Sequence, residues 1–282
     1  MKKPQWITIG IAVLAVVVIY AFGRTRPLSH SGTAPVAAMR SSEEPDLTDS
    51  ILNLARRQIK PDQQLRINQL ENSITRGDVK DQKLKVLHEL AHFWRDTAGF
   101  FAPYAWYLAE AARLENSEKT LTFAAHSLLD NLQQEQEAGI RRWEAQQARD
   151  LFERSLKINP GNDSSRVGIG ACYLFGGLSP TPMEGISKIR EVIVKDSSNV
   201  FAQMMLVKGS MMTGQYSNAI NRLHTVLRFE PANLEANLIL ADVYERTNDR
   251  EAAIRQYQES LKYVQRADLR TEIEKRIAEL RK

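Results

Sequence analysis

The sequence contains one cysteine, Cys172, among 282 residues. A single thiol can form neither a disulfide within the chain nor a metal site built from several thiolates. Cys172 lies in the apolar stretch GIGACYLFGG, where a cysteine is more often a small buried hydrophobe than a nucleophile. This glycine-rich stretch follows no predicted strand and lacks the lysine of a phosphate-binding loop. We therefore expect no cofactor.

Acidic residues are missing from the beginning of the chain, because none precedes Glu43. Five basic residues lie in that segment: Lys2, Lys3, Arg24, Arg26 and Arg40. The whole chain has 38 lysines and arginines against 34 aspartates and glutamates, so its positive charge comes from this tail and the rest is nearly neutral. A nucleic-acid-binding protein needs a basic face. We expect no nucleic-acid partner and no small-molecule substrate.

Charge of either sign is absent from residues 4–23, PQWITIGIAVLAVVVIYAFG. About 20 apolar residues in a helix span the ~30 Å core of a bilayer, so this run predicts a transmembrane helix at 4–23 within an anchor at 1–23. The basic residues before it favour a cytoplasmic N-terminus and a body on the periplasmic, extracytoplasmic side of the inner (cytoplasmic) membrane. The alternatives are cleavage as a signal peptide at Ala21-Phe22-Gly23 and a single span with a cytoplasmic body.

Hydrophobic periodicity is lacking in residues 24–45, which are rich in serine, proline, alanine and threonine and predict a flexible linker. From about residue 46 onward, apolar residues recur at helical spacing, and no convincing strand alternation appears. The sequence therefore predicts an all-α body.

Two similar segments punctuate this body: LKINPGN, which ends at Asn162, and LRFEPAN, which ends at Asn233. Counting back from Pro231 gives a 34-residue frame from Val200, followed by another from Leu234. The first frame contains Leu206, Ala219, Leu223, Val226 and Pro231, and the second contains Leu240, Ala241, Tyr244, Ala253, Tyr257 and Ser260. This pattern resembles the tetratricopeptide repeat, in which small residues occupy the close crossings of paired helices.

The resemblance implies an α-solenoid of tetratricopeptide-type helix-turn-helix repeats over residues 84–265. Its units are 84–116 and 117–162, which diverge from the pattern, then 163–199, 200–233 and 234–265. The unit 117–162 is too long, so we expect longer helices around QQEQEAGIRRWEAQQ, and the loop GGLSPTPM accounts for extra residues in 163–199. Lead-in helices at 46–83, broken at Pro61, and a capping helix at 266–282 complete the predicted body.

The segment HELAH at residues 88–92 matches the His-Glu-x-x-His motif of zinc metalloproteases. A third histidine at the spacing of the extended motif is absent, and Glu110 is the candidate acidic ligand at a loosely suitable distance along the chain. We therefore expect no catalytic or metal-binding residue. A membrane-bound zinc metallopeptidase that uses this motif remains the alternative function.

In the tetratricopeptide resemblance, one face of the first helix of each pair lines a groove that binds segments of partner proteins. With Ala91 at the small-residue position, Leu87 and Leu90 face the core, while His88 and His92 face the groove. The predicted groove residues are His88, His92, Arg95, His126, Met204, Lys208, Met212, Leu238, Asp242 and Glu245. The implied function is a membrane-anchored protein–protein interaction scaffold of the bacterial cell envelope, with other proteins or peptides as partners.

Overall fold

A computed structural model describes residues 47–76 and 79–282. The predicted transmembrane helix at 4–23 and the linker at 24–45 lie outside the described residues. Within the described ranges, no helix combines the length and the apolar character that crossing a membrane requires. Residues Asp46–Lys282 form one compact unit.

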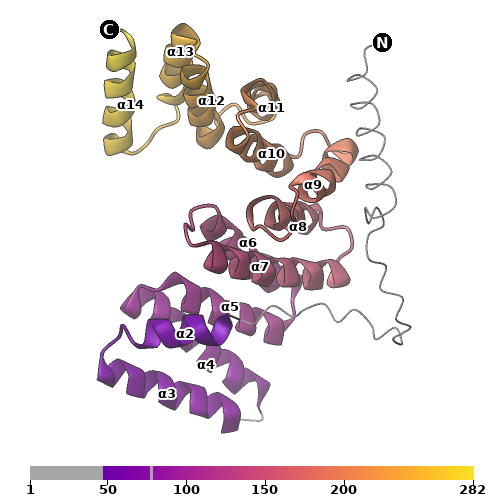
Figure 1. Cartoon of the computed structure of the whole chain (residues 1–282), viewed down its shortest axis with the longest axis vertical. Coiled ribbons are helices and arrows are strands. Elements are labelled where there is room, and N and C mark those ends of the chain that lie inside the picture. Colours follow the sequence, from indigo (N-terminus) through magenta and orange to yellow (C-terminus); the bar gives the residue numbers. More distant parts are fainter. Residues whose placement is uncertain (1–46, 77–78) are drawn as a thin grey trace, which may run out of the picture. The chain divides into compact units, whose positions relative to one another are not determined.

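The described part of the chain is all-α, as the sequence predicts (Figure 1). In order, its helices are α2 (Thr48–Arg56), α3 (Pro61–Arg76), α4 (Lys80–His92), the π-helix η1 (Phe93–Ala98), α5 (Phe101–Glu115), α6 (Glu118–Leu132), α7 (Ala138–Ile158), α8 (Asp163–Phe175), α9 (Met183–Lys195), α10 (Val200–Met212), α11 (Tyr216–Phe229), α12 (Leu234–Arg246), α13 (Arg250–Ser260) and α14 (Ala267–Leu280). Packing is most extensive within the pairs α4/α5, α6/α7, α8/α9, α10/α11 and α12/α13. The exact limits of the repeats stay a prediction.

Small residues allow the paired helices to cross closely. A Cβ atom built on Gly170 of α8 would lie 2.8 Å from the carbonyl oxygen of Gly185 in α9 and 2.6 Å from Ile189 Cγ1. Neither distance leaves room for a methyl group, so only glycine fits at this crossing. Ala219 and Ala253 take the corresponding places in the next two pairs and are wholly buried, in agreement with the predicted pattern.

Asparagine side chains fix where the first helix of three successive pairs begins. The capping residues of α8, α10 and α12 are Asn162, Asn199 and Asn233. Each side-chain oxygen accepts a hydrogen bond of 2.8 to 2.9 Å from the backbone N–H three residues later. This bond satisfies one of the N–H groups that a helix start leaves without a partner. Gly214 and Asn248, at φ 69° and 63°, form the turns within the last two pairs.

The pair α6/α7 places its additional residues in one helix. The sequence predicts longer helices around 133–147, yet α6 ends at Leu132 and only α7 is long, at 21 residues. Residues 133–137 form the loop between them. Its last residue, Glu137, caps α7 because its carboxylate accepts hydrogen bonds of 3.0 and 2.6 Å from the backbone N–H groups of Gly139 and Ile140.

A π-helix follows the HELAH segment, and the sequence does not predict it. Phe93 and Trp94 are consecutive, yet they are 4% and 0% exposed. Both aromatic side chains of η1 enter the core. Trp94 packs edge-on against Phe93 and Phe100, and Gly99 ends the element at φ 74°.

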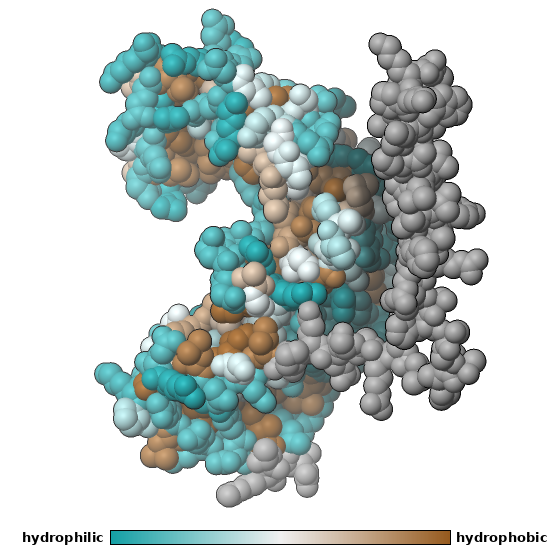
Figure 2. Space-filling view, viewed as in Figure 1, coloured by the Kyte–Doolittle hydropathy of each residue, from teal (hydrophilic) through white to brown (hydrophobic). Residues whose placement is uncertain are grey.

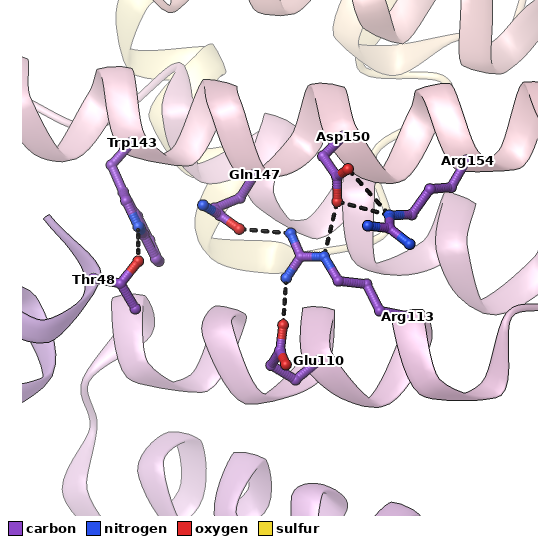
Figure 3. A network of polar contacts seen from close by, with 7 residues as sticks. All are labelled: Thr48, Glu110, Arg113, Trp143, Gln147, Asp150 and Arg154. Carbon is purple, nitrogen blue, oxygen red and sulfur yellow. Dashed lines mark hydrogen bonds and ion pairs between the residues drawn. The ribbon is translucent and has the colours of Figure 1, made fainter. Parts of the chain in front are cut away.

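Polar contacts fasten α2 and α5 to α7 (Figure 3). Trp143 Nε1 donates a buried hydrogen bond of 2.8 Å to Thr48 Oγ1. Arg113 of α5 donates to Asp150 and Gln147 of α7 at 2.8 and 2.6 Å. These contacts hold the N-terminal helices against the helix whose first turn borders the candidate site.

Candidate partner-binding groove

A cavity of about 470 Å³ lies where the first helices of neighbouring pairs end. The ends of α6, α8 and α10 line it, together with the first turn of α7 and the middle of α12. Figure 2 shows the surface hollowed on the left of the view, between α12 and the loop after α6. We call this cavity the main groove.

Apolar side chains form the floor of the main groove. They are Leu132, Phe175, Met211, Met212, Leu238 and Ile239. Leu132 and Phe175 are buried at the bottom, whereas Met212 is 67% exposed at the rim. Methionine side chains are flexible and polarisable, so they adapt to partners of different shape. An exposed apolar surface of this kind typically marks a binding site.

Charged groups border this floor. Arg141 and Lys208 are the cations of the main groove, and Asp242 is its anion. Lys208 pairs with Glu235 at 3.0 Å, and Asp242 pairs with Arg246 at 2.7 Å. These pairs are partly exposed to water and contribute about 1 kcal/mol or less each, so a charged partner can replace them at low cost.

A second cavity, of about 460 Å³, adjoins the main groove between α12, α13 and α14. Leu238 and Asp242 line both cavities. Glu245 lies in the second cavity, where it accepts hydrogen bonds from Arg276 and Tyr257. Burial opposes the ionisation of Glu245, but the bonds from Arg276 and Tyr257 outweigh it and lower the pKa of this carboxyl.

A third cavity, of about 210 Å³, lies between α4, η1, α5 and α6. It brings together three predicted groove residues, His88, His92 and Arg95. The Arg95 guanidinium lies 5.3 Å from the ring centre of Tyr104, and Phe123 is 62% exposed on the opposite wall. This cavity shares no lining residue with the other two.

The predicted residues His126 and Met204 do not line any of these cavities. Met204 is 5% exposed in the core formed with α11 and α12, so it offers no surface to a partner. His126 packs edge-on against Phe152 and Phe201, and its Nε2 lies 2.9 Å from Ser164 Oγ. Burial lowers the pKa of His126. We correct the prediction for Met204, because its side chain is buried in this core. His126 is partly buried beside aromatic rings, and its role in partner binding stays a prediction.

The geometry around HELAH gives no support to a zinc metallopeptidase. Glu89, which would have to activate water, instead accepts a hydrogen bond of 3.0 Å from Arg66 of α3. His92 Nδ1 lies 3.2 Å from Asp96 and 2.9 Å from the Arg95 guanidinium. A neighbouring cation disfavours metal binding at this histidine.

The candidate third ligand is also engaged elsewhere, since Glu110 pairs with Arg113 at 2.7 Å. Among residues 47–76 and 79–282, no three histidine, cysteine or acidic side chains gather as a metal site would require. Cys172 is 0% exposed, and burial raises the pKa of its thiol, which confirms that it is a buried small hydrophobe.

Several residues of the main groove carry no signal that the repeat pattern could assign to it. Leu132, Gln133, Arg141 and Phe175 line it but were not predicted. Phe175 is the exception among them, because it is the last residue of α8 as Met212 is the last residue of α10. The others come from α6, the loop after it and α7, where the repeat pattern diverges and gives no register.

Comparison with known proteins supports part of the family resemblance. A tetratricopeptide repeat family model matches residues 210–271, which run from the end of α10 into α14. No curated protein matches the sequence. The structure of MamA, residues 41 to the end, from Desulfovibrio magneticus RS-1 is 18% identical, with 66% of this chain and 96% of that chain covered and a TM-score of 0.40. Yeast Tom70 is 10% identical, with 88% of this chain and 67% of that chain covered and the same TM-score of 0.40. The family model alone supports the tetratricopeptide resemblance, and it does so for residues 210–271.

Proposed function

We propose that this chain is a non-catalytic scaffold that binds a segment of a partner protein in the main groove. The observation that supports this most directly is the apolar floor, which four helices far apart in the sequence build together. The tetratricopeptide match at residues 210–271 includes α12, whose Leu238 and Asp242 line the main groove. Binding there would bury the exposed Met212 side chain and stabilise the complex by the hydrophobic effect.

The scaffold is further proposed to be anchored in the inner membrane of a bacterium and to act in the cell envelope. This proposal rests on the uncharged run 4–23 and the basic residues before it. The chain should sediment with membranes, and protease added to spheroplasts should degrade its body. Protection of the body in intact spheroplasts would contradict the proposed topology.

Site-specific crosslinking in the native host tests the groove. A photoactivatable residue at Leu238 should capture a defined partner, and Met212→Glu should abolish that crosslink. Val194 supplies the matched control, because it is apolar, 88% exposed and lines none of the three cavities. Val194→Glu should therefore leave the crosslink unchanged. Equal loss in both variants, or none in either, would refute binding in the main groove.

A further inference from the structure

The main groove and the second cavity form one continuous surface, because Leu238 and Asp242 line both. The two ends of this surface differ in charge. Near α7, Arg141 and Lys208 outnumber Asp242. Near α14, the acidic side chains Glu245, Glu272 and Glu279 outnumber the basic Lys275 and Arg276. The excess is positive at one end and negative at the other.

The walls offer little backbone hydrogen bonding to a partner. All the lining elements are helices or their ends, whose N–H and C=O groups bond within the helix. At the end of α10, the carbonyl oxygens of Gly209, Ser210 and Met211 already accept hydrogen bonds from the backbone N–H groups of residues 213–215. An extended peptide would leave its own polar backbone without partners on an apolar floor, which is costly. A helix satisfies its backbone internally and avoids this cost.

We propose, building on the scaffold function above, that the continuous surface binds an amphipathic helix of a partner protein with a defined charge order. Its apolar face covers Met212 and Leu238. Its acidic end lies beside Arg141 and Lys208, and its basic end lies beside Glu272 of α14. Charge complementarity of this kind selects partners and sets the direction in which the helix lies.

Designed peptides test this proposal with the full chain in detergent. Three peptides of about 18 residues, roughly 27 Å as helices, share one leucine-rich face. One carries glutamates at one end and lysines at the other, the second carries glutamates at both ends, and the third carries lysines at both ends. The first should bind about tenfold more tightly than either of the others, since each of those places like charges together at one end.

The complementary experiment reverses charges on the protein and measures binding of the same three peptides. Arg141→Glu with Lys208→Glu should make the peptide with lysines at both ends the tightest binder. Lys157→Glu with Arg228→Glu makes the same change in charge at exposed residues outside the cavities and should preserve the original order. Equal binding of all three peptides would overturn the charge order.

Absence of any peptide binding would overturn the helical occupant. In either case a persisting native crosslink at Leu238 would leave the scaffold function intact. If the chain with the photoactivatable residue at Leu238 and no other change forms no crosslink, and no peptide binds, both proposals are rejected.

Discussion

Glu144 is a wholly buried carboxylic acid on α7. Burial is the main cause that raises its pKa to about 8; a hydrogen bond from Asn131 Nδ2 opposes this shift, and the nearby charge of Glu135 adds to it. The second carboxylate oxygen, Oε2, has no hydrogen-bond partner among the described residues. The side chain is therefore mostly protonated at neutral pH, and its ionisation would place an uncompensated charge in the core.

This buried acid predicts a pH-dependent stability. The pKa of Glu144 is 4.5 in the reference state and about 8 in the folded chain. The stability that its protonated form contributes is therefore fully present below pH 4.5 and is lost as the pH rises toward 8. Between about pH 5 and about pH 9, Glu144 should account for a loss of about 2 to 5 kcal/mol.

Glu144→Gln should remove that part of the pH dependence, because an amide of the same shape cannot ionise. Urea unfolding of both proteins at the two pH values measures the difference. Parallel pH profiles would show that Glu144 does not titrate in this range.

Gly185 lies where α8 and α9 cross, and replacing it by alanine has two opposing effects on the stability of the chain. Alanine has a helix propensity about 1 kcal/mol better than glycine. A Cβ atom at Gly185 would also lie 2.8 Å from the backbone nitrogen of Leu174 and 3.1 Å from Tyr173 Cβ. Backbone atoms cannot move aside as a flexible side chain can, so overpacking should prevail.

Gly185→Ala should therefore destabilise the chain by about 1 to 3 kcal/mol. Gly161→Ala is the control, because the nearest atom to its Cβ would be Asn159 Oδ1 of an exposed side chain, at 3.2 Å. Denaturant titration of both variants gives the comparison. A stability gain for Gly185→Ala would mean that the helices separate easily here.

Periodicity places most core residues correctly and fails where a helix is buried on nearly every side. Leu87 and Leu90 are buried, as their spacing around Ala91 predicts. Met204 is spaced one turn from Lys208 and was assigned to the same face, yet α10 is buried at Ala202 through Val207 without interruption. Without a polar face, the pattern cannot indicate which side meets the groove. Phe152 and Phe201 pack against His126 from other helices, a contact that local sequence does not encode.

At the scale of single elements, α2 is short, and one buried hydrogen bond, from Trp143 Nε1 to Thr48 Oγ1, joins it to α7. Thr48→Val keeps the shape of the side chain but leaves the indole N–H without this acceptor. The expected cost is about 1 to 3 kcal/mol, because the donor stays buried.

Hydrogen exchange resolved by segment should report this change as faster exchange in α2, with α10 to α13 unaffected. Thr122→Val is the matched control, since its hydroxyl bonds only to backbone carbonyls of its own helix. Uniformly faster exchange in every helix would contradict a local role for the Thr48–Trp143 contact.

The helices themselves were largely predictable, and the deviations have local physical causes. Asn162, Asn199 and Asn233 cap helices where the sequence placed a helix start. The π-helix after His92 was not predictable, because no periodic pattern of the sequence distinguishes it from a continuation of α4. The late start of α7 depends on Glu137, and glutamate is not among the preferred capping residues.

At the scale of the whole molecule, the scaffold function and the metallopeptidase alternative predict different effects of Glu89→Gln. A metallopeptidase would lose its general base and its activity. In the scaffold, Glu89 only pairs with Arg66 on the surface, and loss of this pair should change stability by about 0.5 kcal/mol or less.

Complementation of a deletion strain checks this prediction, and Glu89→Gln should restore growth or morphology fully. The replacement of both His88 and His92 by alanine should also leave the fold intact, as judged by circular dichroism. Failure of a well-expressed, folded Glu89→Gln protein to complement would refute the non-catalytic scaffold.

The groove as a whole was only partly predictable. Lys208, Met212, Leu238 and Asp242 were assigned by repeat register, and they do lie around one cavity. Their continuity with α14 and with the end of α6 depends on the angles between successive pairs. Those angles follow from packing among residues distant in sequence, which a repeat pattern does not specify.

Because Cys172 is buried, the rate at which its thiol reacts with a reagent measures how often the surrounding helices separate. A thiol reagent can react only after α8 has separated from its neighbours, because this side chain is 0% exposed and is the only cysteine in the sequence. Arrays of repeats open in parts, so the labelling rate should measure opening of the middle pairs while the outer pairs remain folded. A partner that bridges α8, α10 and α12 should slow the labelling, and a partner that binds elsewhere should not. The labelling rate of the native cysteine thus shows, without any engineered probe, whether a partner is bound across α8, α10 and α12.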